Sequence, residues 1–292
     1  MAAFDKDNQP LDTNGLEQHI ATALATPEPS GLRLEISYGI VRRMFKPVIS
    51  GGERIPDKPC LFVGNHSLFA LDGAVLAPVL LKEYGRWVRG LGDRFLFAND
   101  SVADFVIQLG GVIGHPEVCS AMMENQRDLL VFPGGAHEAV KSAEDMYALQ
   151  WKERYGFIKL AAKHGYTIMP FGLVGPDEFY GHLIEGHELP DSMLGKVLSR
   201  MGILTDDTRS DMMPPIPVGS LGSLIPKPQR CYLGFGEPVD LSAFEGKKLT
   251  KPKLKSLRKQ VSDEIEEQLA SLLLLREQRR GNDGLLRRIL TL

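Results

Sequence analysis

The sequence predicts an α/β fold, with a mostly parallel central sheet flanked by helices and with helical N- and C-terminal extensions. Short apolar runs alternate with longer helical patterns from about residue 53 to residue 240, and this alternation is typical of βαβ units. The 292 residues are enough to bury a sizeable core, and 43% hydrophobic and 24% charged residues are ordinary values for a globular protein.

The sequence of the N-terminal part predicts a weakly ordered arm followed by an amphipathic helix. Residues 1 to about 30 are polar and rich in proline, with a short helix expected at 15–25, and residues 30–48 have a helical pattern. Apolar residues four apart form one stripe along this helix: Leu32, Ile36, Ile40 and Met44. Four basic residues accompany the stripe, so it either packs on the core of the protein or lies on a membrane surface.

The central part supplies the strands and helices of the sheet. The expected strands are 60–64, 87–91, 111–114, 129–133, 167–175 and 231–236. The expected helices are 73–84, 101–109, 116–127 and 151–164. The stretch 181–229 is irregular, and is interpreted either as an excursion over the active face or as a long surface loop.

The C-terminal part predicts a long helix at 252–280 followed by a short amphipathic segment. One stripe of the long helix is apolar: Leu257, Val261, Ile265, Leu269 and Leu272. In the final segment, 285–292, four aliphatic residues lie opposite Arg287 and Arg288. These patterns divide the chain into an N-terminal arm (1–52), a catalytic domain (53–245) and a C-terminal helical extension (246–292).

Composition excludes several classes of function and suggests a location. A net charge of −3 gives no general attraction to nucleic acid, and three widely spaced cysteines favour neither a disulfide framework nor a metal site. No apolar run approaches the roughly 18 residues that a membrane-spanning helix needs, and the first residues lack the pattern of a secretory signal. We therefore expect a cytoplasmic protein that associates with membranes only peripherally.

The sequence GNHSLFALD, residues 64–72, is the first candidate site. His66 and Asp72 follow a predicted strand, and a strand end that leads into a helix is a common ligand site in open α/β folds. Six positions on a regular helix would turn the two side chains apart, so they meet only if the chain loops before the next helix. Either the pair is a general base with its orienting acid, or it is a polar loop with a structural role.

The sequence LLVFPGGAHEA, residues 129–139, is the second candidate site. A strand ends before two glycines, Gly134 and Gly135, whose amides are candidates to face an oxyanion or a phosphate. A tight turn that ends the strand is the alternative. His137 and Glu138 follow directly.

Together these two motifs resemble the glycerolipid acyltransferases, and more narrowly the diacylglycerol-acyltransferase and phytyl-ester-synthase branch. The resemblance covers roughly residues 55–245 and includes the segment 147–175 and the sequence LGFGEPVDL at 233–241. It implies acyl transfer from acyl-CoA or acyl carrier protein, with no cofactor and no metal. It implies that His66 is the general base and that Asp72 orients it. Asn65, Gly134, Gly135, His137, Glu138 and Arg94 are then the candidate substrate-binding residues.

Two departures from the commoner members of the family bear on the acceptor. Five residues rather than four separate His66 from Asp72, as in the phytyl-ester branch. In the FPEGTR block of those members an Arg is associated with the acceptor's phosphate, whereas this chain has Gly134 and His137 at the matching Glu and Arg positions. Because a guanidinium binds phosphate bidentately and histidine does not, we expect a neutral alcohol such as diacylglycerol. Arg89 and Arg94 either compensate for the missing Arg or form structural salt bridges.

The predicted function is therefore acyl transfer to a lipid hydroxyl at a membrane surface. One alternative is a 1-acylglycerol-3-phosphate acyltransferase. The others are a lipid esterase or thioesterase, in which water replaces the alcohol, and a non-catalytic lipid-binding protein. No GxSxG motif supplies a serine nucleophile, so hydrolysis would also depend on His66 and Asp72.

Overall fold

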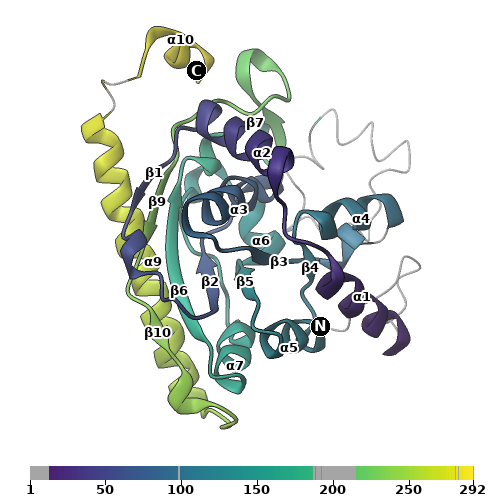
Figure 1. Cartoon of the computed structure of the whole chain (residues 1–292). Coiled ribbons are helices and arrows are strands. Elements are labelled where there is room, and N and C mark those ends of the chain that lie inside the picture. Colours follow the sequence, from purple (N-terminus) through teal and green to yellow (C-terminus); the bar gives the residue numbers. More distant parts are fainter. Residues whose placement is uncertain are drawn as a thin grey trace.

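The computed structural model describes residues 13–97, 99–186, 188, 192, 215–279, 281 and 283–291. In this part of the chain a central sheet lies between two layers of helices, and the long helix α9 runs along its whole length (Figure 1). The fold is the predicted α/β class.

The central sheet has the strand order β1-β9-β6-β2-β5-β3-β4, with β10 paired to β6. Its pairs are parallel except that β9 and β10 run antiparallel to β6. A separate two-stranded sheet joins β7 and β8. The strand bounds are β1 (Val48–Ser50), β2 (Cys60–Gly64), β3 (Val88–Gly92), β4 (Val112–Ile113), β5 (Asp128–Val131), β6 (Thr167–Val174), β7 (Gly181–Ile184), β8 (Ile216–Val218), β9 (Tyr232–Phe235) and β10 (Val239–Asp240).

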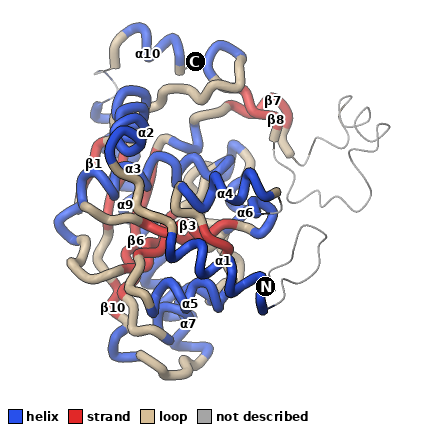
Figure 2. Tube along the Cα trace, turned by 45° about the vertical axis from the view of Figure 1, so that its right-hand side comes forward, coloured by secondary structure: helices blue, strands red, loops and turns tan. Residues whose placement is uncertain are grey.

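Two hydrophobic clusters cover the two faces of the sheet. One is built with the helices α1 (Thr13–Ala25), α5 (Pro116–Glu124), α7 (Gly156–Lys163) and α9 (Lys251–Arg279). The other is built with α2 (Gly31–Met44) and α3 (Leu71–Tyr84). Successive residues of β2 alternate between the two clusters, as a pleated strand requires: Phe62 joins the α2–α3 side and Val63 the α9 side. Figure 2 shows the remaining helices, α4 (Asp100–Gln108), α6 (Gly135–Ala139) and α10 (Leu285–Leu290).

The helix α2 packs on the core with Val41 and Phe45, which widen the predicted stripe, and with Tyr38, rather than with the centre of that stripe. Tyr38, Val41 and Phe45 are buried against β6 and α3 residues. Leu32, Ile36 and Ile40 point away from the core, with exposed fractions of 75%, 53% and 50%. The helix carries two apolar stripes, and the larger aromatic side chains of the second one fill the core. The first stripe is therefore available for another contact.

The helix α9 is part of the core rather than an appendage. All five residues of its predicted stripe are buried, and Leu254 joins them. Leu269 packs closely on β6, because a Cβ atom added at Gly172 would lie 3.2 Å from its Cγ. Although α9 is long, its surface is charged, and no helix among the described residues could cross a membrane.

Most element boundaries agree with the sequence expectations, but the helix expected at 151–164 begins only at Gly156, and the helix expected at 30–48 ends at Met44. The other differences are at short elements. The strands β1 and β10 and the helix α6 were not predicted; they have 3, 2 and 5 residues. Within 181–229, which was expected to be irregular, β7 and β8 form a hairpin-like pair. Residues 187, 189–191 and 193–214 of that stretch lie outside the described part. The strand β1 comes from the predicted N-terminal arm, yet it joins the central sheet through β9.

We predict that Leu269→Ala lowers the free energy of unfolding by about 2–5 kcal/mol, because it removes a buried side chain that is 3% exposed and packs on β6. The matched control is Leu274→Ala on the same helix, where the side chain is 63% exposed and the change should stay within about 0.5 kcal/mol. Urea denaturation measures both. Equal values for the two variants would contradict the placement of α9 in the core.

Candidate active site

The predicted site residues gather at one edge of the sheet, where the parallel strands end. His66 follows β2, Gly134 follows the neighbouring strand β5, and Arg94 follows β3, the next strand along the sheet. Because the carboxyl ends of parallel strands meet at one edge, residues 70 positions apart become neighbours. The structure thus brings the two sequence motifs together.

A backbone kink brings His66 and Asp72 into contact. Phe69 and Ala70 both adopt left-handed backbone conformations, with φ of +58° and +54°, before the regular turns of α3 begin. The kink returns Asp72, in the first turn of α3, toward the strand end. As a result, the Nδ1 atom of His66 lies 2.7 Å from the Oδ2 atom of Asp72.

Asp72 is held in a single orientation. Its side chain is 1% exposed. The backbone amide of Ser67 donates to Oδ2 at 2.6 Å, and the amide of Asp72 donates back to the Ser67 hydroxyl. A buried carboxylate so fixed selects the tautomer in which Nδ1 of His66 carries the proton. The Nε2 atom of His66 is then left as the acceptor, on a side chain that is 12% exposed.

Phe132, the first residue of the FPGG sequence, fixes the plane of the imidazole. The two rings are parallel, with 4.3 Å between centroids and 6° between planes. Phe132 in turn contacts Phe171 of β6 edge to face. The sequence interpretation did not single out Phe132, because a phenylalanine at a strand end is usually only core.

The peptide units on both sides of His66 are held by two residues of the segment that follows the glycines. Glu138 accepts a hydrogen bond from the His66 amide at 2.8 Å and another from the amide of Gln150. The ammonium group of Lys141 donates to the His66 carbonyl and, at 2.9 Å, to Asp177. Glu138 is fully buried, and the side chain of Lys141 is 4% exposed. These contacts position His66 and leave little room for either side chain to reach a substrate.

The contacts of Lys141 continue to the C-terminal helix. Asp177 also accepts from the amide of Tyr147, whose hydroxyl donates to Glu178 at 2.7 Å. Glu178 pairs with Arg276 of α9. Burial raises the pKa of Asp177, although the Lys141 ammonium opposes that shift. Lys141 and Asp177 were missed from the sequence; Asp177 follows β6, so the rule of strand ends would have found it.

Asn65 joins the His66 loop to the neighbouring strand β6. Its side-chain amide donates to the Leu173 carbonyl at 3.0 Å and accepts from the Leu173 amide at 2.9 Å, and the residue is 2% exposed. Both ends of the amide are used on β6. The geometry suits a residue that ties the His66 loop to the sheet, as Glu138 does from the other side.

The local structure explains why both of these positions in the FPGG sequence are glycine. A Cβ atom at Gly134 would lie 1.9 Å from a carboxylate oxygen of Glu138, and Gly135 has a φ of +53°. The amide of Gly135 donates to the Phe132 carbonyl and so closes a turn. That hydrogen bond corrects the expectation for Gly135, whose amide is not available to an oxyanion. The amide of Gly134 remains a candidate.

The three arginines and the histidine that could bind an anionic substrate differ in their location and in their hydrogen-bond partners. Arg154, which the sequence interpretation missed, donates to the carbonyls of Pro133 and Gly134 at 2.8 and 2.7 Å. Arg89 is 1% exposed and donates to the Gly110 carbonyl, which favours the structural alternative over compensation for the missing Arg. Arg94 lies in the helical turn after β3. The Nδ1 atom of His137 is buried with no hydrogen-bond partner in the described structure.

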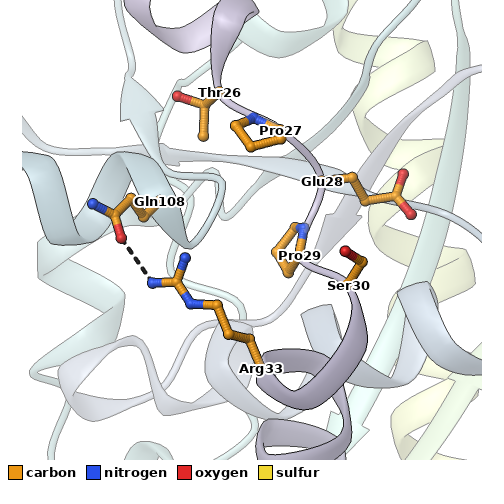
Figure 3. A pocket seen from close by; sticks show the side chains of 7 residues that line it. All are labelled: Thr26, Pro27, Glu28, Pro29, Ser30, Arg33 and Gln108. Atoms are coloured by element: carbon orange, nitrogen blue, oxygen red, sulfur yellow. Dashed lines mark hydrogen bonds between the residues drawn. The ribbon is translucent and has the colours of Figure 1, made fainter.

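One surface hollow lies away from this site. The turn between α1 and α2 and the end of α4 enclose about 180 Å³, and Arg33 bridges it to Gln108 at 2.7 Å (Figure 3). None of the predicted site residues lines it. Within the described residues, no three histidine, cysteine, aspartate or glutamate side chains converge as metal ligands would.

The family was identified by comparison with known proteins. Residues 46–174, which include both motifs and the strands that position them, match the model of the acyltransferase family. The chain is therefore similar to the acyltransferase family over residues 46–174. This matched region ends with the last residue of β6.

Two kinds of lipid-synthesising protein are among the proteins that this chain resembles. Phytyl ester synthase 1, chloroplastic, of Arabidopsis thaliana is 28% identical over 247 residues, which are 79% of this chain and 35% of that protein. The chain thus spans about a third of the length of the phytyl ester synthases. A "DGAT1/2-independent enzyme synthesizing storage lipids" of Gallus gallus is 31% identical over 122 residues, 42% of this chain and 36% of that one.

Among solved structures, the 1-acyl-sn-glycerophosphate (LPA) acyltransferase PlsC of Thermotoga maritima is similar to this chain. It has a TM-score of 0.48 and 19% identity, and the alignment covers 82% of this chain and 79% of that one.

Glu138 makes the stability of this chain depend on pH. Burial raises the pKa of its carboxyl group from 4.5 to about 7. The folded state therefore binds this proton more tightly than the unfolded state, and stability is lost as the pH rises from about 4.5 to 7. We predict that the free energy of unfolding falls by about 2–3 kcal/mol more for the wild type than for Glu138→Gln between pH 5 and 7.5.

Urea denaturation at the two pH values checks this prediction. Glu144→Gln, which removes an exposed carboxyl of the same segment, is the control and should follow the wild-type profile. Parallel profiles for the wild type and Glu138→Gln would show that Glu138 is not protonated in this range.

Proposed function

We propose that this chain transfers a fatty acyl group from a thioester, acyl-CoA or acyl carrier protein, to the hydroxyl of a neutral lipid alcohol. The observation that carries the proposal is the 2.7 Å contact between His66 Nδ1 and Asp72 at the strand edge of an acyltransferase-family domain. It leaves Nε2 as the acceptor for the proton of the alcohol. A non-catalytic lipid-binding protein would not need this oriented and partly exposed imidazole.

The proposed reaction needs one base and good positioning. Nε2 of His66 accepts the hydroxyl proton as the alcohol oxygen attacks the thioester carbonyl, and Asp72 stabilises the imidazolium that forms. The amide of Gly134 is our candidate donor to the resulting oxyanion. When the tetrahedral intermediate collapses, the carbon–sulfur bond breaks and the thiolate takes the proton back from His66. No acyl-enzyme forms, so no side-chain nucleophile is required.

The neutral acceptor follows from the residues after the strand β5. At the positions where other family members carry the acidic and basic residues of FPEGTR, this chain has Gly134 and His137, and the guanidinium of Arg89 is buried. The names of the phytyl ester synthase and storage-lipid relatives are consistent with neutral acceptors. Diacylglycerol or a long-chain alcohol is the class that we propose.

A specific observation also favours a second candidate, a 1-acylglycerol-3-phosphate acyltransferase. Arg154 places a positive charge against the FPGG turn, where a phosphate of the acceptor would lie. One nitrogen of its guanidinium, Nη1, is used by two carbonyl oxygens. A phosphate would therefore meet a partly satisfied donor, which is why we rank this acceptor second.

We predict that His66→Ala lowers acyl transfer by about two to four orders of magnitude, because it removes the general base. Asp72→Asn should also lose most activity, because it no longer selects the reactive tautomer. Release of free CoA thiol from acyl-CoA, with and without alcohol, measures both and separates transfer from hydrolysis. Circular dichroism checks folding. Full activity in folded His66→Ala protein would end the proposed mechanism.

We predict that diacylglycerol outcompetes lysophosphatidate as the acceptor in a mixture of the two. Arg154→Gln should leave the ratio of the two products unchanged, since Arg154 holds the turn rather than a phosphate. Lys152→Gln, at an exposed position two residues away, is the matched control. Labelled acyl-CoA and product chromatography give the ratio. A preference for lysophosphatidate that Arg154→Gln abolishes would establish the second candidate instead.

A lipid acceptor is scarcely soluble, so we also infer that the protein works at a membrane surface. The exposed stripe of Leu32, Ile36 and Ile40 on α2 supports peripheral contact, because a stripe that packed on the core would be buried.

A further inference from the structure

The exposed apolar side chains of the described residues are not scattered. Apart from those on α2, many belong to the loop 219–225 and to α10, which lie together at the upper end of the molecule beside α2 (Figure 1). We call these two elements the apolar tip. Its exposed side chains are Leu221 (79%), Leu224 (74%), Ile225 (62%), Leu285 (74%), Leu286 (71%) and Ile289 (48%).

The loop of the apolar tip is built to hold these side chains outward. The amide of Gly219 donates to the Ser223 carbonyl at 2.6 Å, and the amide of Ser220 donates to the Ile225 carbonyl at 2.8 Å. Leu221 adopts a left-handed conformation with a φ of +53°, which is rare for leucine. A strained, hydrogen-bonded loop that exposes large aliphatic groups indicates a surface that is covered by something apolar.

Hydrogen bonds join the two parts of the apolar tip to each other and to α2. The hydroxyl of Ser220 donates to the Leu290 carbonyl at 3.0 Å. The guanidinium of Arg287 donates to the Met44 carbonyl at 2.8 Å and also to that of Pro228. Arg287, which the sequence placed on the outer face, is therefore used to anchor α10.

The basic residues that remain exposed near the tip indicate what covers it. Arg42, Arg43 and Lys46 at the end of α2 and Arg288 on α10 are exposed. The acid of this region, Asp283, pairs with Arg230 and Arg287. An apolar surface with exposed basic residues around it complements a bilayer that contains anionic lipids.

The tip is also connected to the catalytic loop. The hydroxyl of Tyr180 donates to the Leu224 carbonyl at 3.0 Å. The same ring contacts Phe69 edge to face, with 5.8 Å between centroids. Phe69 is 55% exposed and belongs to the kink that places Asp72 against His66. A chain of contacts through Tyr180 thus joins the tip to the kink beside His66.

We propose that the apolar tip inserts into an anionic bilayer surface and that this docking brings the exposed Phe69, and with it His66, to the lipid acceptor. The proposal rests on the proposed function for the identity of the acceptor, but the docking itself does not. The loop enters the interface with its side chains already ordered, so little conformational entropy is lost on binding.

The test compares the wild type with the triple variant Leu221→Asn/Leu224→Ser/Ile225→Ser. All three side chains are exposed, and asparagine tolerates the left-handed backbone, so the variant should fold. The control is Leu274→Ser on α9, where the side chain is 63% exposed. Co-sedimentation uses vesicles of phosphatidylcholine with and without phosphatidylserine. Activity is measured with diacylglycerol in these vesicles and with a short-chain diacylglycerol dissolved as monomers.

We expect the triple variant to bind the phosphatidylserine vesicles at least about tenfold more weakly than the wild type, and Leu274→Ser to bind normally. Turnover of the dissolved acceptor should stay within about twofold, whereas turnover of the vesicle acceptor should fall with binding. If the triple variant loses vesicle binding while the wild type turns over neither acceptor, the result supports the docking and refutes the proposed function.

Two results would overturn the docking. One is wild-type binding by the triple variant. The other is a wild-type dimer, seen by analytical ultracentrifugation, that the triple variant abolishes while neither protein binds vesicles, because the tip would then be covered by a second copy.

Discussion

The contact between His66 and Asp72 depends on two residues in an unfavourable backbone conformation. Left-handed φ values at Phe69 and Ala70 cost of order 1 kcal/mol each, and neither residue is a glycine. The cost is offset by Asp72, whose carboxylate joins the imidazole of His66 to the amide of Ser67. The kink and the buried carboxylate therefore stabilise each other, and the contact between His66 and Asp72 depends on both.

A second group of buried charges holds the loop from the opposite side. Glu138, Lys141 and Asp177 are all nearly inaccessible to water, and isolated charges in such places are strongly destabilising. Each has at least one partner, and two of them bind the peptide units that flank His66. These buried charges fix the position of the His66 loop rather than raise the stability of the fold. Apolar residues could fill the same space at a lower free-energy cost.

Much of the fold and part of the site could be predicted from the sequence, for identifiable reasons. The strands that end at His66 and Gly134 are buried on both faces, so they form continuous apolar runs. The contact of His66 with Asp72 required a kink whose residues, among them Phe69, have no sequence signal for it. Lys141 was missed because a lysine is normally exposed, and nothing local shows that it faces a carboxylate 36 residues away.

The position of β9 has a consequence for how the chain folds. It lies between β6 and β1, so the strand at residues 48–50 pairs only with a strand that begins at residue 232. On a ribosome, β1 leaves the exit tunnel long before its partner is made, and α2 waits beside it with two apolar faces uncovered. Contacts this distant in sequence slow folding. The edge of the sheet at β1 is therefore completed only after nearly the whole sheet-forming part of the chain has been made.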